Sequence, residues 1–210
     1  MSRRRLTPGR PRTKPAEERY ADILDAAERV FVERGIHAAR LDEVTERAGV
    51  AIGTFYLYFG SKHDLMLALR ARFIDRLVRR QDAVVRSLPA DDWVGRLDAW
   101  LSDAVRAYVE HAELHDVLYD HTPINAKTTI QVALETENAH LEAFRRLIAE
   151  RRDAPADAPD PAMAANLIYS AWYGATHVLL HHQAGEIDRL ADELIASITD
   201  LAHRYLHVEP

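Results

Sequence analysis

Apolar residues recur at spacings of three and four along most of the chain, and no run of alternating apolar and polar residues indicates a strand. This pattern predicts an all-α protein of about nine helices. The first helix is expected over residues 15–34, because Ile23, Ala27, Val30 and Phe31 share one face. Gly35 follows them as a left-handed stop.

A short second helix is predicted around Leu41, Val44 and Ala48. Gly49 supplies the positive φ that a tight turn between two helices needs, and a very short third helix is expected over residues 51–58. Ser61 with Asp64 forms a capping-box start for a long fourth helix over residues 61–87. The N-terminal part of the chain is therefore predicted to be a helix-turn-helix head of three helices.

The rest of the chain is predicted to form a C-terminal helical bundle. Expected helices follow Asp92, surround His115 up to Pro123, and cover residues 125–152, and the segment 153–161 is a loop by composition. The helix over residues 162–184 is apolar around most of its circumference, and the last helix, over residues 187–205, carries a seam of apolar residues for helix packing. Together they predict half of a four-helix interface between two copies, although both helices could pack only within one chain.

Charge is distributed unevenly around the formal net value of −6. Residues 1–64 hold 12 basic and 10 acidic side chains, a net charge of +2, which leaves 15 against 23, a net charge of −8, for the remainder. Residues 1–19 alone hold seven basic and two acidic side chains, a net charge of +5. An acidic body is repelled by phosphates, so any nucleic acid is expected at the head.

Several classes of protein are disfavoured by what the chain lacks. It has no cysteine for a disulfide, a thiolate metal site or a nucleophile, and its basic N-terminus is not followed by an apolar signal segment. The uncharged stretch over residues 161–183 contains histidines and other polar residues, which favours a buried helix over a membrane span. Without a G-x-S-x-G elbow, a phosphate loop or a dinucleotide fingerprint, we expect a cytoplasmic protein that is not an enzyme and needs no cofactor.

The most informative segment covers residues 38–65. It combines Gly49-Val50 in the turn with Gly53-Thr54-Phe55-Tyr56, then Tyr58-Phe59 and Ser61-Lys62, after an amphipathic helix that ends at Gly35. In this ordered set, over roughly residues 19–69, the chain closely resembles the TetR family of bacterial transcriptional regulators. The resemblance implies a homodimeric repressor that binds a palindromic operator and is released by a small-molecule effector. It also implies that the positions of Tyr56 and Lys62 contact the DNA backbone.

Individual residues of the head fit this role for physical reasons. Tyrosine hydroxyls at the margins of a recognition helix reach phosphates, and a lysine beside a helix N-terminus is a good phosphate site. The chain departs from the family at Arg40, Ala51 and Ile52, which weakens the caps of two helices and shifts base contacts toward Arg40 and apolar side chains. The candidate DNA-binding residues are Arg40, Thr45, Ala51, Ile52, Gly53, Thr54, Tyr56, Leu57, Tyr58 and Lys62. Arg40 as a solvated loop residue and Tyr58 as a residue packed on the fourth helix are the alternatives.

The expected organisation is a flexible basic arm over residues 1–18, the DNA-binding domain over 19–64 and an effector-binding and dimerisation domain over 65–210. Arginines of the arm are expected to strengthen DNA binding without sequence preference: Arg3, Arg4, Arg5, Arg10 and Arg12. The third part concentrates aromatic and histidine side chains, a mixture that lines pockets as well as ordinary cores. The candidate effector-binding residues are Trp100, Tyr108, His111, His115, Tyr119, His140, Trp172, Tyr173 and His177.

Two pairs of histidines have the helical i, i+4 spacing at which imidazoles share a divalent metal: His111 with His115, and His177 with His181. No His-Glu-x-x-His arrangement accompanies them, so no metal site is predicted. A metal-responsive regulator of the same fold remains one alternative. A helical small-molecule carrier that has lost DNA binding is another.

Overall fold

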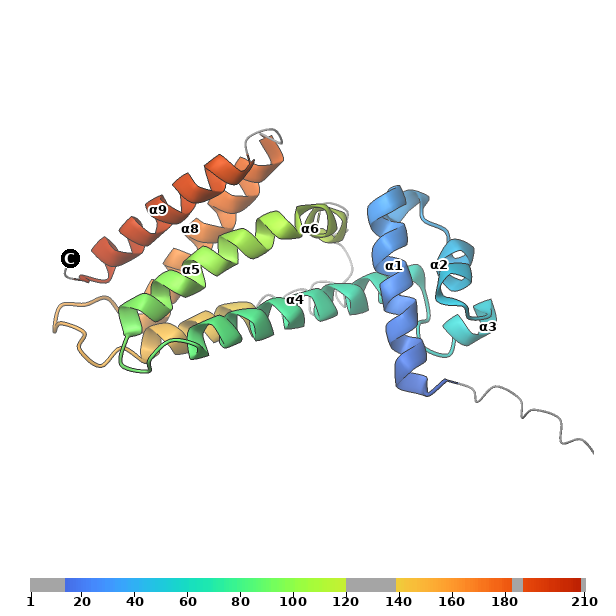
Figure 1. The fold of residues 1–210 in the computed structure, drawn as a ribbon, viewed down its shortest axis with the longest axis horizontal. Coiled ribbons are helices and arrows are strands. Elements are labelled where there is room, and N and C mark those ends of the chain that lie inside the picture. Colours follow the sequence, from blue (N-terminus) through green and yellow to red (C-terminus); the bar gives the residue numbers. More distant parts are fainter. Residues whose placement is uncertain (1–13, 120–138, 183–186, 209–210) are drawn as a thin grey trace, which may run out of the picture. The chain divides into compact units, whose positions relative to one another are not determined.

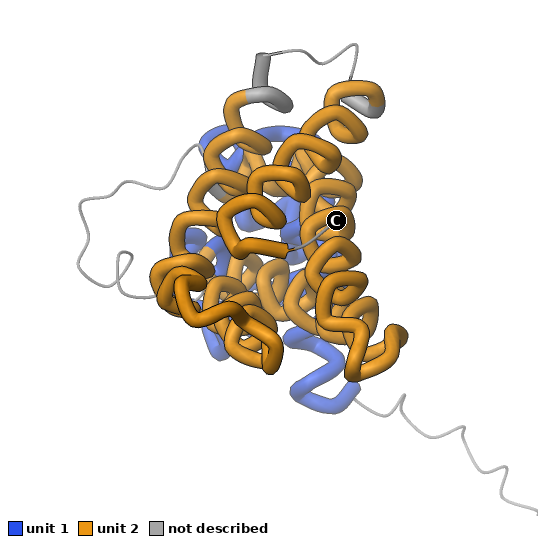
Figure 2. Tube along the Cα trace, turned by 90° about the vertical axis from the view of Figure 1, so that its left-hand side faces the viewer, with its two compact units in different colours: residues 1–66 blue, residues 67–210 orange. Residues whose placement is uncertain are grey.

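The computed structural model describes residues 14–119, 139–182 and 187–208. All regular elements within these ranges are helices, which confirms the predicted all-α class. The chain divides into two compact units, residues 1–66 and residues 67–210 (Figure 2).

The first unit contains α1 (Ala16–Ala38), α2 (Leu41–Ala48) and α3 (Ile52–Phe55) (Figure 1). Apolar residues from all three helices and from the start of the next one are buried together, as the periodicity predicted. The fully or almost fully buried members are Ile23, Ala27, Val30, Phe31, Val44, Phe55, Phe59 and Leu65. This small core fixes the helix-turn-helix.

Gly35 interrupts α1 rather than ending it. Its φ of 71° is positive, as expected, but its ψ of 154° is extended instead of left-handed helical. Glycine tolerates this conformation because it has no Cβ. The chain bends there, and the helical turn resumes so that Ile36 is buried with 7% exposed.

The turn between α2 and α3 follows the prediction, whereas α3 is shorter than expected. Gly49 adopts the left-handed conformation with φ 67° and ψ 31°. The helix ends at Phe55 instead of Tyr58, and the next three residues form a turn in which Phe59 N donates to Phe55 O at 3.0 Å. This turn buries the rings of both Phe55 and Phe59.

The long helix α4 runs over Lys62–Arg86. The capping box at its start is present, because Asp64 N donates to Ser61 Oγ at 3.1 Å and Ser61 Oγ donates to Asp64 Oδ2 at 2.9 Å. Its first residues belong to the first unit and the others to the second. The same continuous helix therefore contributes residues to both units.

The second unit also contains α5 (Trp93–Glu110), α6 (Ala112–Tyr119), α8 (Pro161–His182) and α9 (Ile187–Tyr205). Residues 139–149 are helical as well, within the helix expected over 125–152, whose first part lies outside the described residues. The expected loop is present, except that Pro161 already begins α8. Asp92 caps α5 by accepting a hydrogen bond from Gly95 N at 2.9 Å.

The core of the second unit is formed by α5, α8, α9 and residues 139–149. Its most buried large residues include Leu97, Trp100, Leu101, Phe144 and Ile168. One side of α8 faces this core, whereas Met163, Leu167 and Val178 are about half exposed. In the described part of the chain, no helix is both long and apolar enough to span a membrane.

Candidate nucleic-acid interface and ligand cavity

The helix α3 and the turn after it present an unusual surface. Ile52 is 42% exposed, Tyr56 56% and Leu57 80%, and Ala51 and Gly53 beside them are also exposed. Phe55 and Phe59 lie beneath this surface, with their ring centroids 5.5 Å apart. Large apolar side chains that point to solvent from a well-packed core are typical of a binding surface.

Neither the backbone conformation nor a close contact within the protein requires glycine at position 53. Its φ is not in the left-handed region, and a Cβ added to it would meet no protein atom within 4 Å. Glycine inside a helix is unfavourable when nothing requires it. The absence of a side chain is therefore best explained by another molecule that approaches this exposed backbone.

Tyr58 and Thr54 are half-buried beside this surface. The Tyr58 ring lies 6.2 Å from the ring of Tyr20 of α1, and Tyr20 stacks on Phe59 at 5.3 Å. Tyr58 therefore packs on α1, whereas the alternative interpretation had placed it on the fourth helix.

Arg40 and Thr45 have intramolecular partners. The exposed Arg40 Nη2 lies 2.9 Å from Asp42 Oδ2, and its backbone N donates to Glu43 Oε2 at 3.3 Å. Glu43 thus caps α2 and offsets the loss of a capping side chain at position 40. Thr45 is only 5% exposed, and its Oγ1 donates to Asp42 O at 3.1 Å. The Thr45 side chain faces the core of the first unit. The structure therefore does not support Thr45 as a DNA contact.

Lys62 has an intramolecular role that its sequence context did not indicate. Its Nζ donates to the carbonyl oxygens of Ile36 at 2.7 Å, Ala39 at 3.0 Å and His37 at 3.3 Å. Carbonyls at a helix C-terminus lack partners within the helix and carry partial negative charge. The ammonium group satisfies them, so in this structure Lys62 fastens the end of α1 and does not point a free charge at a phosphate.

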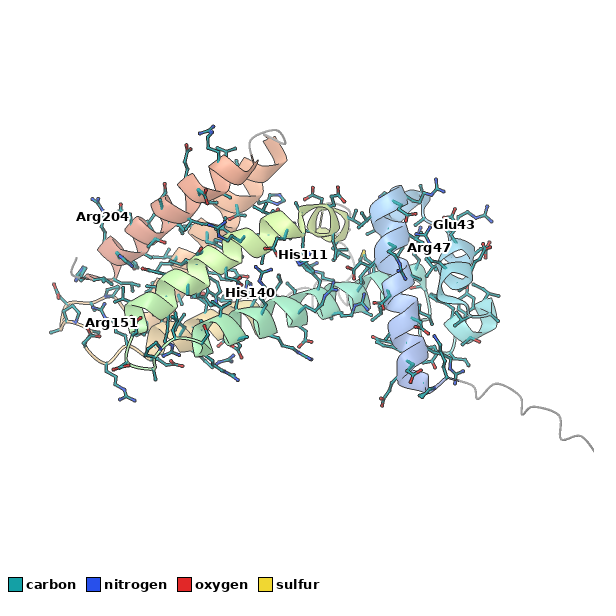
Figure 3. The ribbon with its side chains drawn as sticks, viewed as in Figure 1. Glu43, Arg47, His111, His140, Arg151 and Arg204 are labelled. Carbon is teal, nitrogen blue, oxygen red and sulfur yellow. The ribbon has the colours of Figure 1, made fainter. Side chains whose placement is uncertain are left out.

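Charged pairs at the surface of the first unit are exposed. Arg47 Nη1 lies 2.5 Å from Glu33 Oε1, which joins α2 to α1, lowers the pKa of Glu33 and raises the pKa of Arg47 (Figure 3). Lys14 Nζ lies 2.5 Å from Asp22 Oδ2. The predicted arm arginines, at positions 3, 4, 5, 10 and 12, lie outside the described residues.

A small cavity lies inside the second unit. It offers about 20 Å³ to the centres of water-sized molecules, little more than one water needs. It is enclosed by α4, α5, α6, the helix over residues 139–149 and α8. The lining residues are Phe73, Ile74, Leu77, Gln81, Ala104, Tyr108, His115, His140, Tyr169, Trp172 and Tyr173.

His140 lies at the polar side of this cavity and joins three helices (Figure 3). Its Nε2 forms a short hydrogen bond with Gln81 Oε1 of α4, and its Nδ1 lies 2.9 Å from the Tyr169 hydroxyl of α8. An amide oxygen accepts, so Nε2 carries the proton and the Tyr169 hydroxyl donates to Nδ1. Burial lowers the pKa of His140 to about 4, so the ring is neutral near pH 7.

The structure brings five of the predicted effector residues to the cavity: Tyr108, His115, His140, Trp172 and Tyr173. Trp100 lies behind them, 5.3 Å from the His140 ring, and His177 Nδ1 lies 3.2 Å from the Tyr108 hydroxyl. His111 is exposed and contacts the edge of Phe73 at 5.9 Å, outside the lining. The side chain of Tyr119 lies outside the described part.

Sequence reasoning missed the wall that α4 contributes. Phe73, Ile74, Leu77 and Gln81 follow one another at spacings of one, three and four, so they share a helix face. Gln81 is the only uncharged polar residue among them, and that was the available signal. Tyr169 is one of many aromatic residues in this part of the chain, and nothing in its spacing relates it to His140.

The histidine pairs do not assemble a metal site in the described residues. No group of three or more His, Asp or Glu side chains is suitably placed there for a metal ion. The side chain of His181 lies outside the described part.

The fold and the exposed face of α3 define a helix-turn-helix protein with a separate helical domain. The family model described as "Bacterial regulatory proteins, tetR family" matches residues 23–69. This match confirms the resemblance to the TetR family that was inferred from the sequence.

Curated relatives are transcriptional regulators. The chain is 48% identical over 64 residues to the HTH-type transcriptional activator FasR of Mycolicibacterium smegmatis, covering 30% of this chain and 29% of that protein. It is 33% identical over 73 residues to the fatty acid metabolism regulator protein of Bacillus subtilis, covering 35% of this chain and 38% of that protein. The matches thus span less than half of these relatives.

Solved structures resemble the chain over most of its length. A TetR-family transcriptional regulator from Pectobacterium atrosepticum is 26% identical with a TM-score of 0.69, covering 93% of this chain and 97% of that one. The fatty acid degradation regulator FadR from Bacillus halodurans is 20% identical with a TM-score of 0.71, covering 86% and 97%. The head followed by a helical domain is therefore the fold of TetR-family regulators.

Proposed function

We propose that the protein is a cytoplasmic, ligand-responsive repressor that binds a palindromic operator as a homodimer. The exposed face of α3, with Gly53 open at its centre, is the observation that supports this function most directly. A protein without a partner for this face gains nothing from exposing Ile52 and Leu57.

The recognition surface suits the major groove. We propose that Gly53 allows the α3 backbone to approach the DNA and that the exposed Tyr56 donates its hydroxyl to a phosphate. Ile52 and Leu57 offer apolar contacts to thymine methyl groups. Arg40 reaches guanine only if it leaves Asp42, and exposed pairs of this kind separate at a cost below about 1 kcal/mol.

The homodimer is proposed to form through α8 and α9. The exposed apolar residues Met163, Leu167 and Val178 recur at spacings that place them on one stripe of α8, together with Gly174. Residues 161–182 contain no Asp, Glu, Lys or Arg. An uncharged stripe with a small residue is self-complementary, which a two-fold interface requires.

Effector release is proposed to act through α4. The first turn of this helix holds Lys62 in the head, and its later turns supply Phe73, Leu77 and Gln81 to the cavity. A ligand that favours one position of α4 over another changes the spacing of the heads in the dimer. Coupling of this kind is typically worth about 1–3 kcal/mol.

The nature of the effector does not follow from the relatives. A FadR structure from Bacillus subtilis is described as a complex with stearoyl-CoA, but at 19% identity the likeness concerns the fold alone. The metal-responsive alternative lacks a ligand cluster in the described residues. The cavity must therefore be interpreted from its own chemistry.

Selection of double-stranded DNA from a random library tests the proposed function. We expect a palindromic winner, and titration at several salt concentrations should give an affinity that falls steeply with salt. Tyr56→Ala should weaken binding about tenfold. Arg204→Ala, which removes an exposed residue of α9, should leave it unchanged.

Two outcomes bear on the alternatives. Deleting residues 2–13 should flatten the salt dependence, because five arginines are lost. Absence of any enriched sequence, for a protein that circular dichroism shows to be folded, would favour the carrier that has lost DNA binding.

A further inference from the structure

We propose that the cavity of the second unit binds an uncharged, flat aromatic molecule that carries a hydrogen-bond acceptor such as a carbonyl oxygen. The inference rests on the proposed function only in taking this molecule as the effector. The chemistry of the ligand follows from the cavity itself.

The walls favour an aromatic ligand. Tyr108, Tyr169, Trp172 and Tyr173 line the cavity together with Phe73. The rings of Tyr169 and Tyr173 are nearly parallel, with an interplanar angle of 7° and centroids 6.3 Å apart. Such rings offer flat faces and edges to another ring, and aromatic pairs gain energy beyond the area they bury.

Charged ligands are disfavoured by the same lining. None of the lining residues is Asp, Glu, Lys or Arg. His140 is 2% exposed, and the low pKa of its imidazole keeps it neutral near pH 7. A carboxylate or a phosphate buried here would lose its hydration without a counter-charge, and a cation would meet the unpartnered N–H donors of Gln81 and Trp172.

Two buried donors at the cavity need an acceptor. Gln81 is 1% exposed, and its Nε2 has no hydrogen-bond partner within the structure described. The hydrogen bond from His140 to Gln81 Oε1 fixes the orientation of the amide. The NH₂ group is therefore the end of the amide that lacks a hydrogen-bond partner. Trp172 Nε1, in a residue that is 3% exposed, is likewise without a partner there. Buried donors without partners are costly, and a ligand that carries an acceptor would remove this cost.

The small volume of the cavity restricts the shape of the ligand. About 20 Å³ for the centres of water-sized molecules accommodates little more than a single water. Any ligand must therefore move side chains apart. A flat ring system is thin, so it requires a smaller separation of the walls than a bulkier molecule of the same area.

Four probes test this ligand class on the full-length protein by quenching of tryptophan fluorescence and by calorimetry. Coumarin and 1-indanone are flat, uncharged and carry a carbonyl acceptor. Naphthalene lacks the acceptor, and coumarin-3-carboxylate adds a charge. We expect coumarin and 1-indanone to bind at least tenfold more tightly than the other two probes.

Variants locate the binding site. Gln81→Met and Trp172→Phe should each weaken the binding of coumarin about tenfold while changing that of naphthalene less than twofold, since each removes an N–H donor. Gln81→Met keeps a side chain of similar volume, and Trp172→Phe keeps an aromatic ring. Trp93→Phe is the matched control, because the indole N–H of Trp93 already donates to Leu147 O at 2.8 Å. Circular dichroism verifies that every variant is folded.

Three results would overturn the inference: tighter binding of naphthalene or coumarin-3-carboxylate than of coumarin, no binding of either carbonyl probe, or coumarin affinity that neither Gln81→Met nor Trp172→Phe changes. Operator binding measured without any probe separates this failure from failure of the proposed function. If coumarin binds as expected and no DNA is selected, the cavity assignment stands and the regulator proposal fails.

Discussion

Single residues of the head show how one position can serve stability or binding. Gly49 and Gly53 are four residues apart, yet only Gly49 has the positive φ, 67°, for which glycine is needed in the fold. Neither would meet a protein atom within 4 Å if it carried a Cβ. Substituting both therefore separates a conformational role from a role in binding.

Gly53→Ala is expected to stabilise the protein by up to about 1 kcal/mol, because alanine reduces the entropy of the unfolded chain and meets no obstacle. The same change should weaken operator binding about tenfold, since the new methyl group stands where the DNA approaches. Urea unfolding and fluorescence anisotropy measure the two effects. Gly49→Ala, the control, should destabilise by about 1 kcal/mol because of its positive φ. Unchanged affinity for Gly53→Ala would remove α3 from the DNA interface.

Lys62 offers a second separation of roles. Lys62→Met keeps the aliphatic part of the side chain but leaves the carbonyls of Ile36 and Ala39 without their donor. We expect the free energy of unfolding to fall by about 2 kcal/mol. Lys14→Met, which removes an exposed pair with Asp22, should leave it nearly unchanged, because solvent screens the pair. Normal stability with a flattened salt dependence of DNA binding would instead indicate that the ammonium group contacts a phosphate.

At the scale of elements, the sequence predicted the helices well because each has an apolar stripe that its own residues define. Local signals such as Ser61-Asp64 and Gly49 also located two boundaries correctly. Contacts between distant segments could not be predicted in this way. His140 is 59 residues from Gln81 and 29 from Tyr169, and no periodicity relates helices that far apart in the chain. For the same reason, nothing in the sequence indicated that Lys62 binds three backbone carbonyls, which lie at least 23 residues away from it in the chain.

The His140 contacts make the packing of α4, α8 and residues 139–149 sensitive to acid. The pKa of about 4 in the folded protein lies below the ordinary histidine value of 6.5, so the unfolded chain binds the proton more strongly between these two pH values. Stability contributed by neutral His140 is therefore complete above about pH 6.5 and is lost as the pH falls toward 4. The loss should approach about 3 kcal/mol.

Urea unfolding between pH 7 and pH 4 measures this dependence, with His140→Gln as the reference. The variant retains polar atoms beside Gln81 and Tyr169 but does not titrate. Subtracting its curve from that of the parent protein removes the contributions of the carboxylates and the other histidines. Parallel curves would mean that the pKa of His140 is the same in the folded and unfolded protein, which would contradict the effect of burial.

At the scale of the whole molecule, the strongest constraint is the exposed stripe of α8. Half-exposed apolar residues are common singly, but Met163, Leu167 and Val178 lie on one uncharged helix. A repressor that recognises a palindrome also needs two heads related by two-fold symmetry. Both considerations support the proposed dimer, with a second copy of the chain on this stripe.

Leu167→Glu tests the dimer. A carboxylate in a two-fold interface is buried twice without a counter-charge, which costs on the order of 3 kcal/mol or more and weakens dimerisation over a hundredfold. Light scattering should show a dimer for the parent protein and a monomer for the variant. Ala83→Glu, at an exposed position of α4, introduces the same charge elsewhere and should remain dimeric. The monomer should keep its helical circular dichroism and lose affinity for the palindrome more than for a single half-site. A Leu167→Glu protein that stays dimeric would require an interface away from the centre of α8.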